Sequence, residues 1–365
     1  MATEEGKTIS LNVLVDKQRN RVVFVESNND FIDILLSFLT IPVGTVLRLA
    51  RKQKQPCGIG CMDNLYQSLE DFDSELFEKE SLRHMLLRPE NLAGALCKRL
   101  KINIDDTELT KYYVCPQLTI DTYYSRQHAS SLLSISNNEQ CSCGELMSLP
   151  INLSDEKVED GNIEDRGVFV NALKGISFTV TDDIQILPFS TETSFAHLNA
   201  LGIKRMNELD EKTINVGVEE IISILRHSFL SKIPLTEVLL WKSAHEIPQI
   251  SPFQSKYTAQ SKSEDTANAE STKKTVTIIF CKSQNKILYA EAGEDFVEFL
   301  FSLLTLPLGS VVKLLDQNPS LGCISNLYKT VEGTGTTLAR HVKTAERHRY
   351  SLRCLPLISV ARANF

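Results

Sequence analysis

Apolar residues near the N-terminus follow the two-residue period of a strand before they change to the spacing of a helix. Leu11, Val13 and Val15 recur at every second position, which is the period of a half-buried β-strand. The polar segment DKQRN and a second β-branched run, RVVFVE, follow directly. Two such runs around a short polar segment predict a β-hairpin.

A helix is predicted directly after this hairpin. The apolar residues that share one helical face are Phe31, Ile34, Leu35, Phe38 and Leu39. Ser27 and Asp30 have the spacing of a capping box, which places the start of the helix at Asn28. Pro42 and Gly44 break or kink this helix, and the segment TVLRLARK is predicted to resume it.

The same pattern recurs 265 positions later in the chain. Residues 26–49 and 291–314 align without a gap and are identical at 11 of 24 positions. The preceding residues 11–26 and 276–291 also align without a gap, and CMDNLY matches CISNLY after a three-residue deletion. The sequence therefore predicts a tandem duplicated hairpin-plus-helix unit with a truncated second copy. Pairing of the two copies across a pseudo-twofold interface is compatible with this repeat.

The middle of the chain has a pattern of its own. Gly175–Ser190, GISFTVTDDIQILPFS, predicts two strands around a Thr-Asp-Asp turn, and two helical segments follow. Hairpins beside helices, without a regular β-α-β alternation, favour an α+β fold.

Changes in composition divide the chain into six segments. The expected segments are a first copy (1–110), a cysteine-containing segment (111–165), a second hairpin with helices (166–247), a flexible linker (248–274), a partial second copy (275–331) and a divergent, disordered tail (332–365).

Composition then narrows the class of protein. The chain has 365 residues, of which 42% are apolar and 23% charged, and its formal net charge is −7. These values are ordinary for a globular protein of two or three domains. An acidic chain does not favour nucleic acid or an anionic membrane as a partner, because such surfaces depend on clustered Lys and Arg.

Targeting signals are not found in the sequence. The opening residues, MATEEGKTIS, lack the apolar core of a secretory signal. The most apolar window, residues 31–41, ends at Pro42 and is shorter than the roughly twenty residues that a membrane-spanning helix needs. Nine cysteines in such a chain favour a reducing compartment. We therefore expect a cytoplasmic or nuclear protein without a membrane partner.

Four motifs together resemble a known family. They are VFVESNNDFIDILLSFLTIPVGTVLRL, CSCGELM, FTVTDDIQILP and ILRHSFLSKIPLTEVLL. Between residues 8 and 330 the chain is similar to the plant proteins grouped under domain of unknown function 674. The resemblance implies tandem copies of one unit and implies no activity. Residues Glu332–Phe365 depart from it, because they carry six Arg or Lys against two acids and match nothing in the first copy.

Cys115, Cys141 and Cys143 are the strongest candidates for chemistry. In the segment CSCG, glycine permits a tight turn that directs two thiolates at one metal ion. A tetrahedral zinc site needs four ligands, and Cys115 would be the third and His128 the fourth. Zinc ribbons usually use paired Cys-x-x-Cys knuckles, however, and Cys115 has no near partner. A structural zinc knuckle and a set of free buried thiols are therefore both open.

Other clusters have simpler explanations. The segment CGIGC, Cys57–Cys61, keeps one of its two cysteines in the second copy and is expected to be a turn between helices. Glu26, Asp30 and Asp33 are acidic in both copies. Acids at a helix start are favoured by capping and by the helix dipole, so we expect these three to be solvated. The sequence has no complete phosphate loop or nucleophile elbow.

The leading hypothesis is a non-enzymatic protein-interaction or scaffold protein with a structural zinc knuckle and an unknown protein partner. It rests on clear strand and helix patterns in a sequence that has no complete set of catalytic residues. His84 and His227 lie in helical stretches and are expected to be surface or hydrogen-bonded residues. The alternative is an enzyme or small-ligand binder whose site is assembled from dispersed residues. A deep pocket lined by Glu26, Asp30 or a histidine would favour that alternative.

Overall fold

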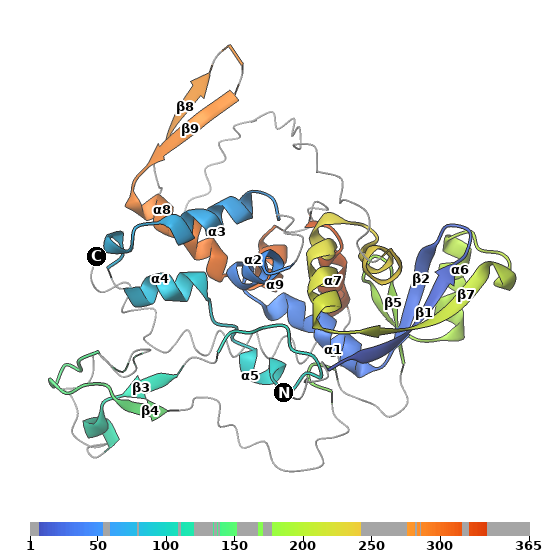
Figure 1. The fold of residues 1–365 in the computed structure, drawn as a ribbon, viewed down its shortest axis with the longest axis horizontal. Coiled ribbons are helices and arrows are strands. Elements are labelled where there is room, and N and C mark those ends of the chain that lie inside the picture. The colour runs from blue at the N-terminus through green and yellow to red at the C-terminus, as the bar shows by residue number, and fades with distance from the viewer. Residues whose placement is uncertain are drawn as a thin grey trace, which may run out of the picture.

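The structure is a computed structural model of the chain. It describes residues 7–53, 59–78, 80–108, 111–119, 134, 137, 139–151, 167–170, 177–241, 276–281, 283–284, 286–315 and 321–333. Helices and strands are mixed throughout these residues (Figure 1), so the fold is α+β, as the sequence predicts.

The strands are β1 (Ile9–Asp16), β2 (Arg21–Ser27), β3 (Tyr112–Val114), β4 (Leu149–Ile151), β5 (Phe178–Thr181), β6 (Ile186–Pro188), β7 (Leu209–Val216), β8 (Val276–Cys281) and β9 (Lys286–Ala292). The α-helices are α1 (Asn29–Ser37), α2 (Val43–Arg51), α3 (Cys61–Asp71), α4 (Glu80–Leu87), α5 (Gly94–Cys97), α6 (Thr191–Ala200), α7 (Val218–Leu230), α8 (Glu294–Ser302), α9 (Leu308–Leu314) and α10 (Ile324–Gly333). Short 3₁₀ turns are η1 (Phe38–Thr40), η2 (Ser74–Leu76), η3 (Pro116–Thr119), η6 (Met206–Glu208) and η8 (Leu303–Thr305), and η7 (Thr236–Leu240) is a π-helical turn.

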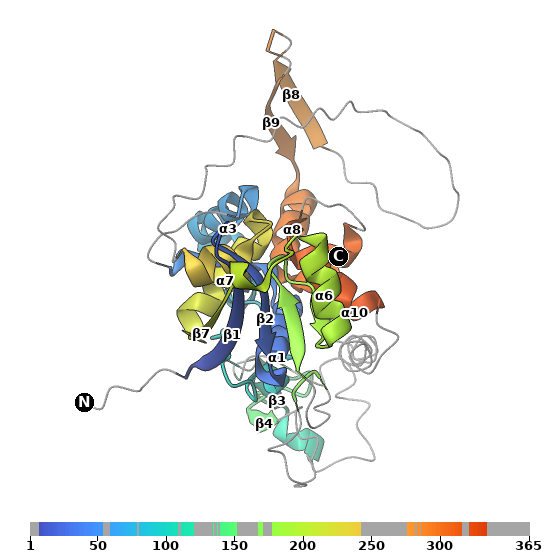
Figure 2. The same ribbon diagram turned by 90° about the vertical axis from the view of Figure 1, so that its right-hand side faces the viewer.

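Five strands form an antiparallel sheet in the order β6-β5-β2-β1-β7. The alternating residues Leu11, Val13 and Val15 of β1 share one apolar cluster with residues of α1 and α7. On the opposite face, Val23 and Phe24 of β2 pack with Leu198 of α6. The β1–β2 hairpin is therefore covered on both faces and paired along both edges (Figure 2).

The start of α1 differs in one detail from the expectation. The side chain of Asn28 accepts a hydrogen bond from the backbone N–H of Asp30 and is the N-cap. The Ser27 hydroxyl instead donates to the carbonyl oxygen of Asn28. The expected capping box at Ser27 is therefore wrong by one residue, because the adjacent asparagine reaches the free amide. The predicted break at Pro42 and restart as α2 are present.

The elements after β8 follow the same order as those of the first hundred residues. α8, η8 and α9 begin 265 positions after α1, η1 and α2. The hairpin irregularity between Leu14 and Val15 recurs between Ile279 and Phe280. This correspondence agrees with the predicted duplication, which stays a prediction about the origin of the two segments.

The two segments meet at equivalent residues. The backbone N–H of Val43 donates to the carbonyl oxygen of Leu306, and the N–H of Leu308 donates to that of Ile41, both at 2.9 Å. Val43 aligns with Leu308 and Ile41 aligns with Leu306, each pair 265 positions apart. The two hydrogen bonds are therefore equivalent. The contact is therefore pseudo-twofold at the level of single hydrogen bonds.

α3 and its equivalent α10 each pack against the other segment. Leu69 of α3 shares an apolar cluster with Phe301 of α8. In turn, Ile324 and Leu327 of α10 are wholly buried in the cluster that contains α1 and the face of the five-stranded sheet. α3 and α10 therefore each contact the other segment as well as their own.

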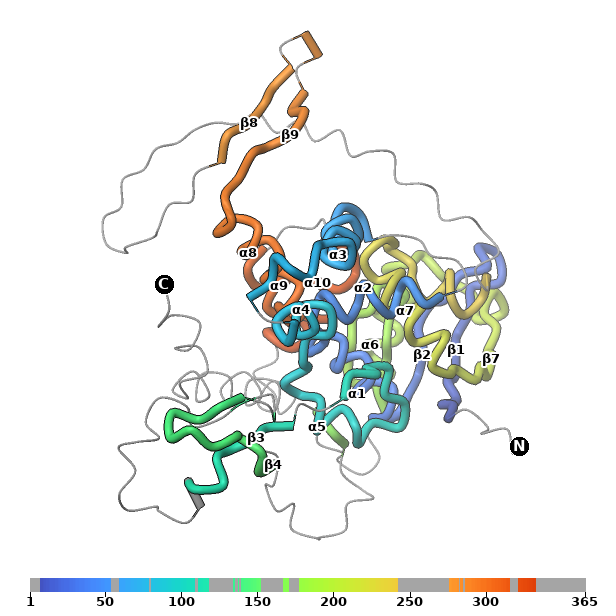
Figure 3. The backbone as a smooth tube through the Cα atoms, turned by 60° about the vertical axis from the view of Figure 1, so that its left-hand side comes forward, coloured from blue at the N-terminus to red at the C-terminus, as the bar shows by residue number. Residues whose placement is uncertain are grey.

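The β8–β9 hairpin projects from α8, away from the rest of the described chain (Figure 3). The predicted linker 248–274 lies outside the described residues, as does nearly all of the predicted tail 332–365. Among the described helices, none is long and apolar enough to cross a membrane.

Candidate metal centre

A small two-stranded sheet positions the cysteine segment. β3 and β4 are antiparallel, with Tyr112 opposite Ile151 and Val114 opposite Leu149. Figure 1 shows this pair at the lower left, apart from the five-stranded sheet. Cys115 directly follows β3, and the turn at residues 141–144 lies against it.

The three cysteines converge as the sequence predicts. The Sγ atoms of Cys115, Cys141 and Cys143 all lie within 4.8 Å of one another, and those of Cys115 and Cys143 are 3.5 Å apart. Tetrahedral zinc with Zn–S bonds of about 2.3 Å would hold its sulfur ligands about 3.8 Å apart, whereas a disulfide bond is about 2.05 Å long. The observed spacing is that of separate thiols, close enough together to hold one metal ion.

Backbone hydrogen bonds shape the turn that carries two of these cysteines. The N–H of Gly144 donates to the carbonyl oxygen of Cys141 at 2.8 Å, and the N–H of Cys141 donates to that of Glu145 at 2.8 Å. Gly144 has a φ of +94°, a conformation that residues with a side chain rarely adopt. The glycine of CSCG is thus required for the path of the backbone.

The surroundings of Cys115 act on its ionisation in both directions. Burial raises the pKa of its thiol, and the neighbouring Cys143 and Cys141 raise it further, whereas the backbone N–H of Gln117 lowers it by donating to the sulfur. An amide that donates to sulfur stabilises the thiolate, the form that binds metal. The sequence pattern did not indicate this amide, because its role depends on the turn after Pro116.

Little apolar surface holds this region together. Cys115, Cys141 and Met147 are buried, with Tyr113 packed partly against them. A cluster of this size contributes little stability by itself, and a bound metal would supply the missing order. Cys143 lies at the surface of the cluster. The fourth predicted ligand, His128, lies outside the described residues.

No other group of three or more His, Cys, Asp or Glu side chains in the described part of the chain has the spacing of metal ligands. Cys57 lies outside the described residues, and Cys61 is exposed at the start of α3. Gly60 precedes it with a φ of +67°, which agrees with the predicted turn between helices.

Asp33 is buried, not solvated as the sequence suggested. Its side chain accepts the backbone N–H groups of Val168, Phe169 and Val170 at 2.6, 2.8 and 2.9 Å. Burial raises the pKa of the Asp33 carboxyl, although the three amides act in the opposite direction. The Asp33 side chain therefore holds residues 168–170 against α1 through three hydrogen bonds. Asp30 is more exposed and pairs with Lys101 at 3.4 Å.

A cleft of about 310 Å³ lies where β2, the β5–β6 turn and α6 meet. A histidine, His197, lines it, whereas Glu26 and Asp30 do not. The Nε2 atom of His197 lies 3.1 Å from the carbonyl oxygen of Val23. This contact of the imidazole is with the backbone and not with a nucleophilic side chain. Arg19 pairs with Asp16 in the same cleft at 3.4 Å.

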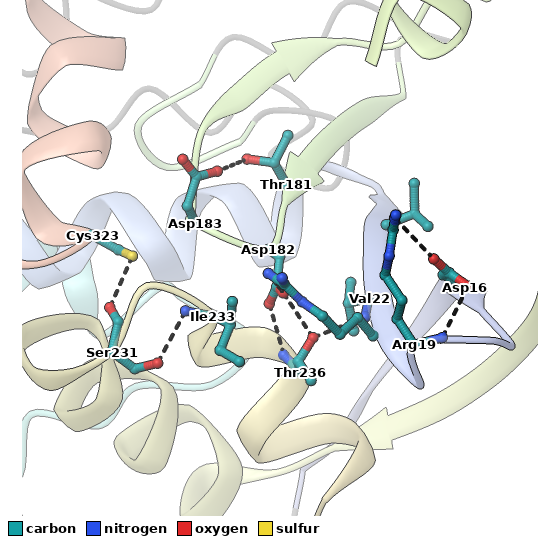
Figure 4. A network of polar contacts seen from close by, with 12 residues as sticks. Asp16, Arg19, Val22, Thr181, Asp182, Asp183, Ser231, Ile233, Thr236 and Cys323 are labelled. Atoms are coloured by element: carbon teal, nitrogen blue, oxygen red, sulfur yellow. Dashed lines mark hydrogen bonds and ion pairs between the residues drawn. The ribbon is translucent and has the colours of Figure 1, made fainter. Parts of the chain in front are cut away.

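The Thr-Asp-Asp turn beside this cleft is a structural junction (Figure 4). Asp182 accepts both the backbone N–H and the hydroxyl of Thr236, at 2.8 and 2.7 Å. The Thr236 hydroxyl in turn accepts the N–H of Val22 at 2.8 Å, and Arg21 reaches Asp182 at 3.2 Å. This network joins β2, the β5–β6 turn and η7. The sequence indicated the turn but not its distant partners.

Comparison with known proteins gives a match to one family. A family model described as "Protein of unknown function (DUF674)" matches residues 5–354. A search of curated proteins and a search of solved structures each found no match. Any assignment of function therefore starts from the geometry of the chain.

Proposed function

The chain belongs to the family described as "Protein of unknown function (DUF674)", and from its own geometry we propose that it binds one structural zinc ion through Cys115, Cys141 and Cys143. The observation that carries this proposal is the convergence of three Sγ atoms within 4.8 Å. Thiolate ligands select zinc among the common divalent cations, and His128 is the proposed fourth ligand. The ion stabilises the β3–β4 region and takes no part in catalysis.

The role of the whole protein in this proposal is interaction with other proteins. The supporting observation is the large exposed apolar surface of the β8–β9 hairpin, where Ile278, Ile287 and Leu288 are each more than half exposed. Exposed apolar surface of this kind is typical of a protein-binding site.

The test is elemental analysis of the purified full chain beside the double variant Cys141→Ser, Cys143→Ser. We expect about one zinc per chain in the wild type and none in the double variant. The β3–β4 region of the variant becomes sensitive to protease, because metal binding and local folding are coupled. His128→Ala tests the fourth ligand and is expected to weaken zinc retention during dialysis against a chelator.

The matched control is Cys61→Ser, since Cys61 is an exposed cysteine outside the cluster. It should retain the full zinc content and the protease resistance of the wild type. A folded wild-type protein that binds no zinc after expression with added zinc would contradict the proposal. The three cysteines would then be free thiols, the other interpretation of the sequence.

The alternative function, an enzyme or small-ligand binder, would use the cleft beside Arg21 and His197. Its volume of about 310 Å³ is at the lower end of small-molecule sites. Two of its charged pairs are bonded within the lining, Arg19–Asp16 and Arg21–Asp182. Saturable binding of a small molecule that is lost in Arg21→Ala would support this alternative.

A further inference from the structure

The β8–β9 hairpin lacks the neighbours that its counterpart has. In the five-stranded sheet, β1 pairs with β7 along one edge of the β1–β2 hairpin and β2 pairs with β5 along the other. In the described residues, β8 and β9 form a sheet of two strands only. Among the described residues, neither outer edge of this sheet pairs with a further strand, and an unpaired edge is a template for added strands.

The side chains of this hairpin match a buried position in the sheet. Val13 and Phe24 are 0% and 8% exposed, whereas the equivalent Ile278 and Tyr289 are each 55% exposed. Apolar residues therefore occupy both faces of β8–β9, as in a hairpin that is covered on both faces. A hairpin that normally faced water would carry polar residues on at least one side.

Three contacts outside the hairpin repeat this difference. The first concerns a carboxylate. Asp33 of α1 accepts three backbone N–H groups of residues 168–170. Its equivalent on α8, 265 positions later, is Glu298, which is exposed. The acidic side chain is present in both copies, but only one of them holds a described amide loop.

The second contact is made at a turn that contains a glycine with positive φ. Gly322 has a φ of +62° and lies so close to Ser228 that an added Cβ would be 2.4 Å from its carbonyl oxygen. The next residue, Cys323, donates its backbone N–H to the same oxygen at 2.7 Å. The equivalent turn is Gly60–Cys61, where Gly60 has a φ of +67° and an added Cβ would meet nothing within 4 Å.

The third contact lies along α10, the equivalent of α3. Asn326 of α10 donates to the carbonyl oxygen and carboxylate of Asp183, both at 3.0 Å. Thr330, one turn later, accepts the backbone N–H of Ile186 at 3.4 Å. Their equivalents on α3 are Asn64 and Ser68, and both are exposed.

We propose that β8–β9, Glu298, Gly60–Cys61 and the Asn64–Ser68 face of α3 form one docking site for a segment of a second polypeptide that resembles residues 167–241 of this chain. That segment would add a strand to each edge of the hairpin, bring an amide loop to Glu298 and place the C-terminal end of a helix on Gly60. Strand addition to a sheet edge is a recurring mode of peptide recognition. We name this surface the second-copy site.

Within residues 1–365, the segment that matches the proposed occupant is already in use, so we assign the occupant to a separate polypeptide. The chain contains one Thr-Asp-Asp hairpin followed by helices, and it is already paired with β1 and β2. Residues 242–275 and 334–365 contain no segment of this pattern. The inference deepens the interaction role proposed above and does not involve the metal centre.

The experiment measures binding of a separately produced polypeptide, residues 167–241 of this chain, to the full-length protein. We expect saturable one-to-one binding and slower hydrogen exchange of the β8–β9 amides in the complex. Asn64→Ala and Glu298→Gln should each weaken binding about three- to tenfold, because each removes one hydrogen-bonded contact.

The matched controls are the equivalent residues in the occupied copy. Asn326→Ala should lower the melting temperature of the full chain and leave its affinity for the added segment unchanged, whereas Asn64→Ala should do the reverse. Binding that is insensitive to both Asn64→Ala and Glu298→Gln would overturn the proposal. The Cys141→Ser, Cys143→Ser variant should still bind, so that a failed zinc assignment and a failed docking site give different results.

A second experiment does not require the free segment to fold by itself. Residues 167–241 are fused behind residue 365 of the full chain through a flexible linker, which raises their effective concentration to about millimolar. Unchanged exchange of the β8–β9 amides in this fusion would also overturn the proposal. Slow exchange in the unfused chain at every concentration would mean that the same molecule covers the site. Slow exchange that grows with concentration would mean a homodimer, and either result replaces the proposed occupant.

Discussion

Pro42 and Pro307 face each other in an antiparallel bridge although 265 residues separate them. They are equivalent positions of the two copies, so the bridge lies on the local pseudo-twofold axis. Proline lacks a backbone N–H, and the flanking residues Val43 and Leu308 supply the donors. The two segments therefore use equivalent residues for the two halves of the contact.

A glycine beside this axis should be sensitive to a single added methyl group. At Gly309 of α9, a Cβ would lie 3.0 Å from the carbonyl oxygen of Leu39, and at Gly44 it would lie 3.1 Å from that of Leu304. We expect Gly309→Ala to lower the free energy of unfolding by about 1–3 kcal/mol, measured by urea denaturation. Without this contact, the same change in a helix would be stabilising. Lys313→Ala, at an exposed position of the same helix, should have little effect.

The hydroxyl of Thr236 should be essential to the junction in Figure 4. Thr236→Val keeps the shape of the side chain but leaves the N–H of Val22 and one oxygen of Asp182 without this partner. Because these groups are buried, we expect a loss of about 1–3 kcal/mol in unfolding free energy. Thr236→Ser retains the hydroxyl and should remain close to the wild type in the same urea titration.

The charge and the acceptor oxygens of Asp33 should contribute more to stability than the volume of its side chain. In Asp33→Asn, one amide oxygen can still accept two backbone N–H groups, but the NH₂ group would face the N–H of Val168 or its neighbours. We expect a loss of about 1–3 kcal/mol in unfolding free energy and faster proteolysis near residues 167–170. The exposed equivalent provides the comparison. If Glu298→Gln destabilised the isolated full chain as much as Asp33→Asn, the assigned role of Asp33 would be incorrect.

His227 should make stability depend on pH. Burial lowers its pKa below the ordinary value of 6.5, and Arg226 also lowers it, whereas the hydrogen bond to Ser223 and the charge of Glu237 raise it. As pH falls below 6.5, the unfolded chain takes up a proton that the folded chain does not. Stability from this group is therefore complete above pH 6.5 and falls below it, by up to about 1.4 kcal/mol per pH unit.

The variant His227→Gln isolates this contribution. The difference in unfolding free energy between it and the wild type should change between pH 7.5 and 5.5, in favour of the variant at the lower pH. His84→Gln is the control, since His84 is exposed on α4. A pH dependence that is identical in the wild type and in His227→Gln would rule out His227 as its source.

Local patterns predicted the parts of the fold that depend on neighbouring residues. The β1–β2 hairpin, the break at Pro42 and the cysteine turn at Gly144 follow from periodicity and backbone preference within a few residues. The convergence of Cys115 with Cys143 was also predicted, because a Cys-x-Cys-Gly turn can direct its thiols at one metal ion. Their binding of metal remains a proposal.

Distant contacts were not predictable in the same way. Asp33 was expected in water because a helix start favours acids, but its actual partners lie more than 130 residues away. The contacts of α3 and α10 with the other segment have no local signal either, since the two helices share the motif NLY but differ in what covers them. The exposed face of α3 was recognisable only by comparison with the buried face of α10.

The packing of α10 against the first segment also has a consequence for synthesis of the chain. Ile324 and Leu327 complete the apolar interior beneath β1 and β2, so a nascent chain that ends before α10 leaves that interior open. Contacts between such distant residues form slowly and expose apolar surface in the meantime. On the ribosome, this interior is therefore complete only when α10 has left the exit tunnel.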